Sequence, residues 1–176
     1  MRSRATSGMS LIELLIGFVL VGVLLGFGVP SFSAWLQNLQ IRNAAEAVQT
    51  GLQLARANAV QRNKSVTFSM PGPDSSWSVT IDSPDVFTGE AASVESRTAA
   101  EGTVNAVVAT TNPTITFDGL GKTNLAAAAL IRVTNPTGGA CQDTGPMRCL
   151  NVAVSVGGQI KMCDPKVVTA GDSRAC

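Results

Sequence analysis

The sequence predicts an α+β protein in which one long N-terminal helix packs against a β-rich C-terminal head. From residue 14 to residue 29 no side chain is charged or strongly polar. Together with Leu11 and Ile12, this run approaches the roughly 20 apolar residues that cross a bilayer as a helix. After residue 63 the sequence changes to short stretches of alternating apolar and polar residues, which are typical of strands.

The composition argues against several classes of function. The chain has 176 residues, carries 13 Lys and Arg against 12 Asp and Glu, and contains no histidine. A nearly neutral balance does not argue for a polyanionic partner. The lack of histidine removes the commonest general base and metal ligand. No nucleophile elbow, phosphate loop or pair of carboxylates at catalytic spacing stands out. We therefore expect no enzyme activity, no metal site and no cofactor.

A short basic leader precedes the apolar run, and Arg2 and Arg4 carry its charge. Basic residues ahead of an apolar segment stay on the cytoplasmic side, so the rest of the chain should face outward. An ordinary secretory signal sequence is the alternative. The length of the apolar run opposes that alternative, and so does Glu13 at its start. A carboxylate costs on the order of a few kcal/mol in lipid, so Glu13 requires a partner or a function.

We expect one helix from about residue 10 to residue 61, bent near Pro30. Residues 9–30 form its hydrophobic half, which would lie in a membrane or in the core of a filament. In residues 31–63 apolar side chains recur at spacings of three and four, which predicts an amphipathic helix. This second half should pack under a sheet, and residues 64–176 should form the head.

The head contains several strand candidates separated by turn signals. They are residues 66–70, 77–82, 104–110, 114–117, 126–134, 150–156 and 160–162. Residues 83–102, with the acidic Asp85, Glu90, Glu95 and Glu101, are interpreted as a loop. The last two strands should form a hairpin with residues 157–159 as its loop. That register pairs Val154 with Met162 and keeps the apolar side chains on one face.

Four cysteines lie near the C-terminus, and they include no CxxC pair. An even set behind a membrane-targeting segment indicates two disulfides in an oxidising compartment. Three pairings are possible in principle. The expected register places Cys149 well beyond the residue that faces Cys163, which disfavours a bridge between these two. We favour Cys141–Cys149 and Cys163–Cys176.

Gly8 and the following Met9-Ser10-Leu11-Ile12-Glu13-Leu14-Leu15 resemble the prepilin signature of type IV pilins and type II secretion pseudopilins. The resemblance implies that residues 1–8 are removed by a prepilin peptidase cutting after Gly8. It also implies methylation of the new N-terminus at Met9, where this family usually has Phe. Glu13 matches the glutamate that is thought to neutralise the N-terminal amine of a neighbouring subunit. Pro30 matches a proline that commonly kinks pilin helices.

A second resemblance spans nearly the full chain. The stretch Thr116-Phe117-Asp118-Gly119-Leu120-Gly121, then a cysteine loop, Gly157-Gly158 and a Cys-Asp-Pro tail ending in cysteine, are similar to GspH/FimT/FimU-type minor pilins. This implies a pilin-like fold, whose head holds two small, mostly antiparallel sheets packed on the helix. The implied partners are other major and minor pilins, the prepilin peptidase and the inner-membrane assembly platform. The implied location is a single pass through the bacterial inner membrane with a periplasmic C-terminus, followed by a pilus on the cell surface.

The resulting hypothesis is a minor pilin of a type IV pilus that takes part in tip formation or the initiation of assembly. One alternative is a GspH-like minor pseudopilin of a type II secretion system. Another is a minor pilin that binds double-stranded DNA for uptake, because FimT-like relatives take up DNA through a basic C-terminal region. The DNA-binding candidates are Arg148, Lys161, Lys166 and Arg174. Basic residues exceed acidic ones only slightly in this region, and Asp172 stands where DNA-binding relatives have a cation, so the signal is weak.

Overall fold

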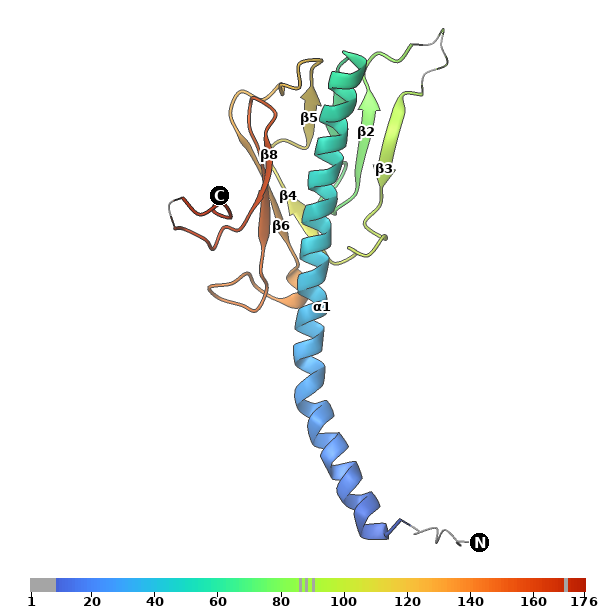
Figure 1. Cartoon of the computed structure of the whole chain (residues 1–176), viewed down its shortest axis with the longest axis vertical. Coiled ribbons are helices and arrows are strands. Elements are labelled where there is room, and N and C mark those ends of the chain that lie inside the picture. Colours follow the sequence, from blue (N-terminus) through green and yellow to red (C-terminus); the bar gives the residue numbers. More distant parts are fainter. Residues whose placement is uncertain (1–8, 86, 88, 90, 170) are drawn as a thin grey trace, which may run out of the picture.

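The computed structural model of the chain describes residues 9–85, 87, 89, 91–169 and 171–176. One helix, α1, runs the length of the molecule, and two sheets flank its C-terminal half (Figure 1). This arrangement confirms the predicted fold class. The head therefore packs against only the C-terminal half of the helix, and the other half extends away from it.

Helix α1 spans Leu11–Arg62, 52 residues, which corresponds to about 78 Å. It begins after the extended Ser10 and ends at Asn63, whose left-handed backbone (φ 50°) lets its N–H bond the carbonyls of Ala59 and Val60. The predicted helix is thus confirmed to within one residue at each end. Helical structure continues through Pro30, and α1 curves in its N-terminal part (Figure 1). A bend centred on Pro30 stays a prediction.

Small side chains allow both sheets to approach the C-terminal half of α1. The helix residues buried in the core are Ile41, Ala44, Ala45, Ala47, Val48, Leu52, Ala55 and Ala59. A Cβ atom at Gly51 would lie 2.7 Å from the Phe68 ring and 2.9 Å from the Trp77 ring. The helix surface is therefore flat enough here for aromatic side chains to lie directly on the backbone.

The first sheet has the strand order β3-β2-β1-β5, and its paired strands are all antiparallel. Its strands are β1 (Val66–Ser69), β2 (Trp77–Ile81), β3 (Ser93–Arg97) and β5 (Thr114–Phe117). Alternate residues of β1, β2 and β5 are buried, and β1, β2 and β5 all contact α1. The strands predicted at residues 66–70 and 77–82 are confirmed, and they pair with each other as a hairpin.

The second sheet has the order β4-β6-β7-β8 and is also antiparallel. Its strands are β4 (Val107–Ala109), β6 (Ala129–Thr134), β7 (Leu150–Val154) and β8 (Ile160–Cys163), and a short 3₁₀ helix, η1 (Pro136–Gly138), follows β6. β6, η1, β7 and β8 contact α1. Side chains from both sheets and from α1 form one core.

Two sequence predictions are wrong in detail. Strand β3 lies within the expected loop 83–102, of which Glu90 falls outside the described residues. The β7–β8 hairpin pairs Val154 with Ile160, and not with Met162. The turn explains this shift, because the N–H of Ser155 donates to the Gln159 carbonyl (2.9 Å) and leaves residues 156–158 as the loop. Gly158, at φ +81°, supplies the left-handed residue that this turn requires.

Candidate assembly surface and C-terminal loops

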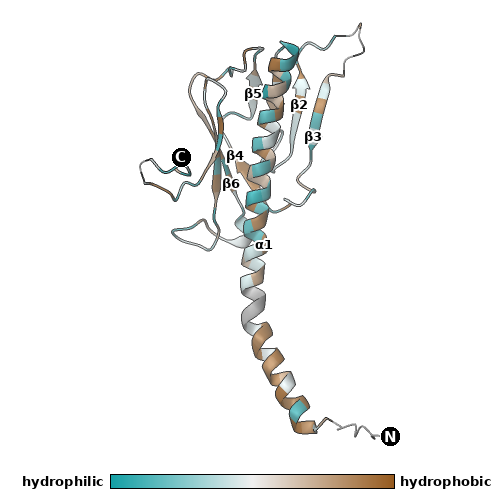
Figure 2. Ribbon diagram, in the orientation of Figure 1, coloured by the Kyte–Doolittle hydropathy of each residue, from teal (hydrophilic) through white to brown (hydrophobic). Residues whose placement is uncertain are grey.

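The N-terminal half of α1 is an uncovered apolar rod. Every residue from 11 to 26 is exposed, and Leu11 and Leu24 keep 81% and 71% of their surface. Hydrophobic colour dominates this half, whereas the half inside the head is mixed (Figure 2). By length and composition alone, α1 could cross a membrane. Such a surface requires a cover of lipid or of other apolar helices.

Glu13 lies in the first turn of this rod. A carboxylate near a helix N-terminus is favoured by the partial positive charge of the free backbone N–H groups. The side chain of Glu13 has no hydrogen bond or ion pair with the described residues. Met9 stands just ahead of the helix and is 71% exposed, whereas Gly8 lies outside the described residues. Pro30 lies in the same helix, about 26 Å along the axis from Glu13.

Two disulfides tie the C-terminal region together. One joins Cys141 to Cys149, with Cα atoms 5.5 Å apart, and the other joins Cys163 to Cys176, with Cα atoms 5.0 Å apart. The first closes a loop after η1 and the second ties the chain end to strand β8. Both lie in the head, away from the N-terminal half of α1 that carries Glu13.

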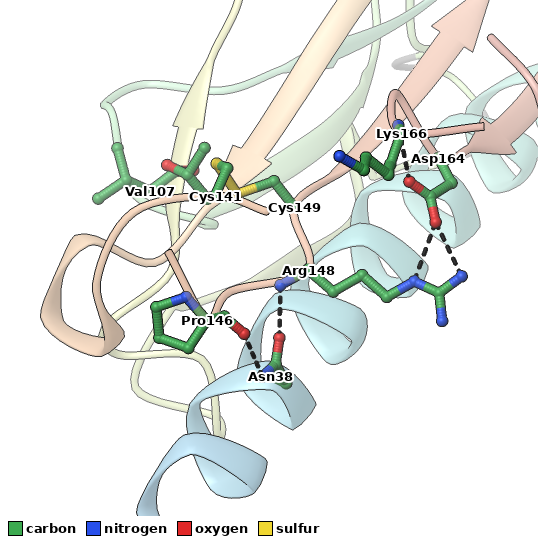
Figure 3. Close-up of a disulfide and its surroundings, with 9 residues drawn as sticks. Asn38, Val107, Cys141, Pro146, Arg148, Cys149, Asp164 and Lys166 are labelled. Carbon is green, nitrogen blue, oxygen red and sulfur yellow. Dashed lines mark hydrogen bonds and ion pairs between the residues drawn. A yellow bond between two sulfur atoms is a disulfide. The ribbon is translucent and has the colours of Figure 1, made fainter. Parts of the chain in front are cut away.

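Asn38 of α1 anchors the first of these loops to the helix (Figure 3). Its Oδ1 accepts from the backbone N–H of Arg148 at 2.7 Å, and its Nδ2 donates to the Pro146 carbonyl at 3.3 Å. Because Arg148 precedes Cys149, the disulfide and the two hydrogen bonds act on the same short segment. The loop is thereby fixed against the helix at the point where α1 enters the head.

Ion pairs then connect the two disulfide-closed segments. The Arg148 side chain donates to Oδ2 of Asp164 from Nε at 2.9 Å and from Nη2 at 2.8 Å. Asp164 is 94% buried, since only 6% of its side chain is exposed. Lys166 forms an ion pair with Asp143 of the first loop. A buried carboxylate needs such a partner, so these contacts hold the tail and the loop in one arrangement.

The remaining two candidate cations are also engaged. The Arg174 side chain donates two hydrogen bonds to Asp172, from Nη2 to Oδ2 at 2.8 Å and from Nε to Oδ1 at 3.2 Å. These hydrogen bonds lower the pKa of Asp172 to about 2, and the carboxylate in turn raises the pKa of Arg174. Lys161 donates from Nζ to the Ala175 carbonyl at 2.7 Å.

The structure therefore places Arg148, Lys161, Lys166 and Arg174 in one region of the head but provides each with a partner. Three of the four are neutralised by a carboxylate. A surface that binds DNA needs cations that are free to neutralise phosphates and so release the counterions condensed on the DNA. A cation that is already paired with a carboxylate contributes little to this release. DNA binding stays a prediction that rests on resemblance.

Sequence reasoning missed the residues that organise this region. Asn38, Asp143 and Asp164 had no assigned role, although Asp164 follows a cysteine directly and Arg148 precedes one. That common position beside disulfides is the signal that could have suggested a pair. Asn38 offered no signal, because the loop it holds is more than a hundred residues away in sequence.

Comparison with known proteins agrees with this geometry. Residues 44–158 match the family described as type II transport protein GspH. No curated protein matches the chain. Two crystal structures of the type IV minor pilin FimU from Pseudomonas aeruginosa PAO1 share the fold. In space group P21 the match has a TM-score of 0.56 and 15% identity, and it covers 77% of this chain and 97% of FimU. In space group P65 the TM-score is 0.53 with 15% identity, and 73% and 97% are covered.

Proposed function

Because the chain belongs to the GspH family of minor pilins and pseudopilins, we propose that it is a minor pilin of a type IV pilus that helps to initiate assembly at the tip. One observation carries this proposal. The C-terminal half of one unbroken helix packs in the core of the head, whereas its N-terminal half is an uncovered apolar rod. A subunit of this shape is suited to be held in a membrane and then moved into a bundle of like helices.

The energetics favour such a transfer. Complete burial of a Leu, Val, Ile or Phe side chain contributes roughly 1.5 to 3 kcal/mol, and this half of α1 exposes many of them. Lipid covers these side chains before assembly, and the helices of neighbouring subunits cover them afterwards. Apolar burial alone is nearly equal in the two environments, so a more specific contact must distinguish them.

Glu13 supplies that contact in the proposed mechanism. In an apolar bundle its carboxylate requires a nearby cation. Cleavage after Gly8 would create an α-amino group at Met9, which stands at the same end of the rod. The amine of one subunit and Glu13 of the next then form a pair, and methylation at Met9 leaves its charge in place.

The test is to replace Glu13 by Gln and to follow the chain through membrane and filament fractions. Glu13→Gln should remain in the membrane, because removing a charge does not oppose insertion, and it should be lost from sheared filaments. Glu46→Gln is the matched control, since Glu46 lies on the same helix in an exposed pair with Arg42, where pairing contributes little. Normal entry of Glu13→Gln into filaments would refute the proposed role.

The family description favours a second candidate, a GspH-like pseudopilin of a type II secretion system. The same helix chemistry serves both machines, so the location of the assembled chain decides between them. Recovery of the chain in filaments sheared from the cell surface supports the pilus. Retention in the envelope, with loss of protein secretion when the chain is removed, supports the pseudopilin.

A further inference from the structure

An exposed aromatic pair marks the neck of the molecule, where α1 leaves its apolar half and enters the head. The rings of Phe32 and Trp35 contact each other with centroids 5.6 Å apart. Phe32 is 58% exposed and Trp35 is 54% exposed. Leu36, one residue further along, is 41% exposed. Large apolar side chains are thus left uncovered just below a well-packed head.

The distance of this pair from the start of the helix corresponds to the thickness of a bilayer. The 21 residues from 11 to 31 rise about 31 Å, and the hydrocarbon core of a membrane measures about 30 Å. Phe32 therefore lies at the edge of the hydrocarbon, and Trp35 lies about 4.5 Å further along the axis. The headgroup layer is about 5 to 7 Å deep on each side, so Trp35 falls within it. A tilt of the usual size, about 20°, shortens these heights only slightly.

The chemistry of the two side chains suits that layer. An indole ring combines a large apolar body with an N–H donor, so it is favoured where acyl chains meet water. The next turn of α1 is polar and already in contact with the head, since Gln37 bonds Asn135 and Asn38 bonds Pro146. The uncovered aromatic surface ends where the head begins.

We propose that Phe32 and Trp35 form an interfacial anchor that sits in the headgroup layer of the outer leaflet while the chain waits for assembly. The anchor sets the height of the head above the membrane. It also holds Glu13 near the opposite face of the bilayer, because the two sites are separated by about one hydrocarbon thickness along one continuous helix. This inference rests on the proposed membrane-held state and adds the depth at which that state is fixed.

The experiment uses the full chain in vesicles of phosphatidylcholine and phosphatidylglycerol that carry bromine at defined acyl positions. Trp35 and Trp77 are the two tryptophans of the chain, and Trp77 is buried in the head with 5% of its surface exposed. Trp35→Phe gives the emission of Trp77 alone, which serves as the control and should not be quenched. We expect loss of Trp35 emission with bromine near the headgroup and much less with bromine near the bilayer centre.

A second variant tests whether the quenching depth follows the position of the fluorophore along the helix. In Phe32→Trp combined with Trp35→Phe, the fluorophore moves three residues, about 4.5 Å, towards the bilayer. Quenching should then shift to deeper bromine positions. An alkaline wash establishes first that the chain is embedded, and a chain that the wash removes would contradict the membrane-held state itself. If the chain is embedded but no brominated lipid quenches the Trp35 emission, or the deepest bromine quenches it most, the proposed anchor is refuted. The membrane-held state would then still stand.

Discussion

Gly51 shows how closely a single residue ties the helix to the head. The space for its side chain is taken by the rings of Phe68 and Trp77, which are themselves in contact, with centroids 5.8 Å apart. Both rings are in the core. A methyl group here would separate the first sheet from α1.

Gly51→Ala should therefore destabilise the head by about 1 to 3 kcal/mol, the usual cost of overpacking a core. The substitution gains up to about 1 kcal/mol of helix propensity, which offsets part of that cost. Gly22→Ala is the matched control, since no atom other than those of its chain neighbours and the surrounding helix backbone lies within 4 Å of the Cβ position there. Chemical unfolding in detergent, followed by near-ultraviolet circular dichroism, measures the difference. Equal stability of the two variants would contradict the close packing.

Asp172 provides a second test for one residue. Its pKa is lowered to about 2 from an ordinary value of 3.8, first because the Arg174 side chain donates to it and then because the Arg174 backbone does. The pair therefore persists above pH 4 and is lost as the pH falls through about 2.

An NMR titration of the Asp172 carboxyl should give a midpoint near 2 in the native chain. In Arg174→Gln the midpoint should rise towards 3.8. Arg148→Gln is the control, because Arg148 pairs with Asp164 instead. A native midpoint at the ordinary value would show that the contact does not form in solution.

Among the elements, the first disulfide loop has the clearest mechanical role, because it fastens the second sheet to α1 through Asn38. The double variant Cys141→Ser with Cys149→Ser should lose roughly 2.5 kcal/mol of stability, the value expected for a loop of this length. Urea unfolding measures this loss. Asn38→Ala in the native background should lose less, because only hydrogen bonds are removed.

Peptide mapping without reduction checks the connectivity that this prediction assumes. Peptides joined through Cys141 and Cys149, and through Cys163 and Cys176, should be recovered. Recovery of Cys149 joined to Cys163 would rule out the arrangement in which the two loops are held together by Arg148 and Lys166.

The elements also show what the sequence can reveal. The helix was predictable along its whole length, because its apolar spacing continues from Phe32 to Val60. Strand β3 was missed because it is an edge strand whose residues are mostly exposed, so Ser93–Arg97 shows no apolar alternation. The hairpin register was wrong because Val156, which is 44% exposed, was assigned to the strand and not to the turn.

Part of the candidate site could be predicted from the sequence and part could not. Gly8, Met9 and Glu13 could, because they form a local motif. The partners of the head cations come from segments that only the fold brings together, such as Lys166 and Asp143. Charge counting treated these cations as free, whereas the structure pairs them.

At the scale of the whole molecule, the two ends of α1 have opposite requirements. The head end is complete, with a core built from both sheets. The other end exposes a long apolar surface with one carboxylate (Figure 2). We propose that neighbouring subunits cover this surface in an assembled filament.

The most direct test places a photo-crosslinking residue at Leu24, which is 71% exposed on the rod, in cells that assemble filaments. A second chain with the same residue at Val156, on the surface of the head, serves as the control for contacts outside the rod. Illumination of sheared filaments should join Leu24 to the N-terminal helix of another pilin. Sheared filaments in which Leu24 forms no such adduct, or which lack the chain while the membrane retains it, would show that neighbouring subunits do not cover the rod.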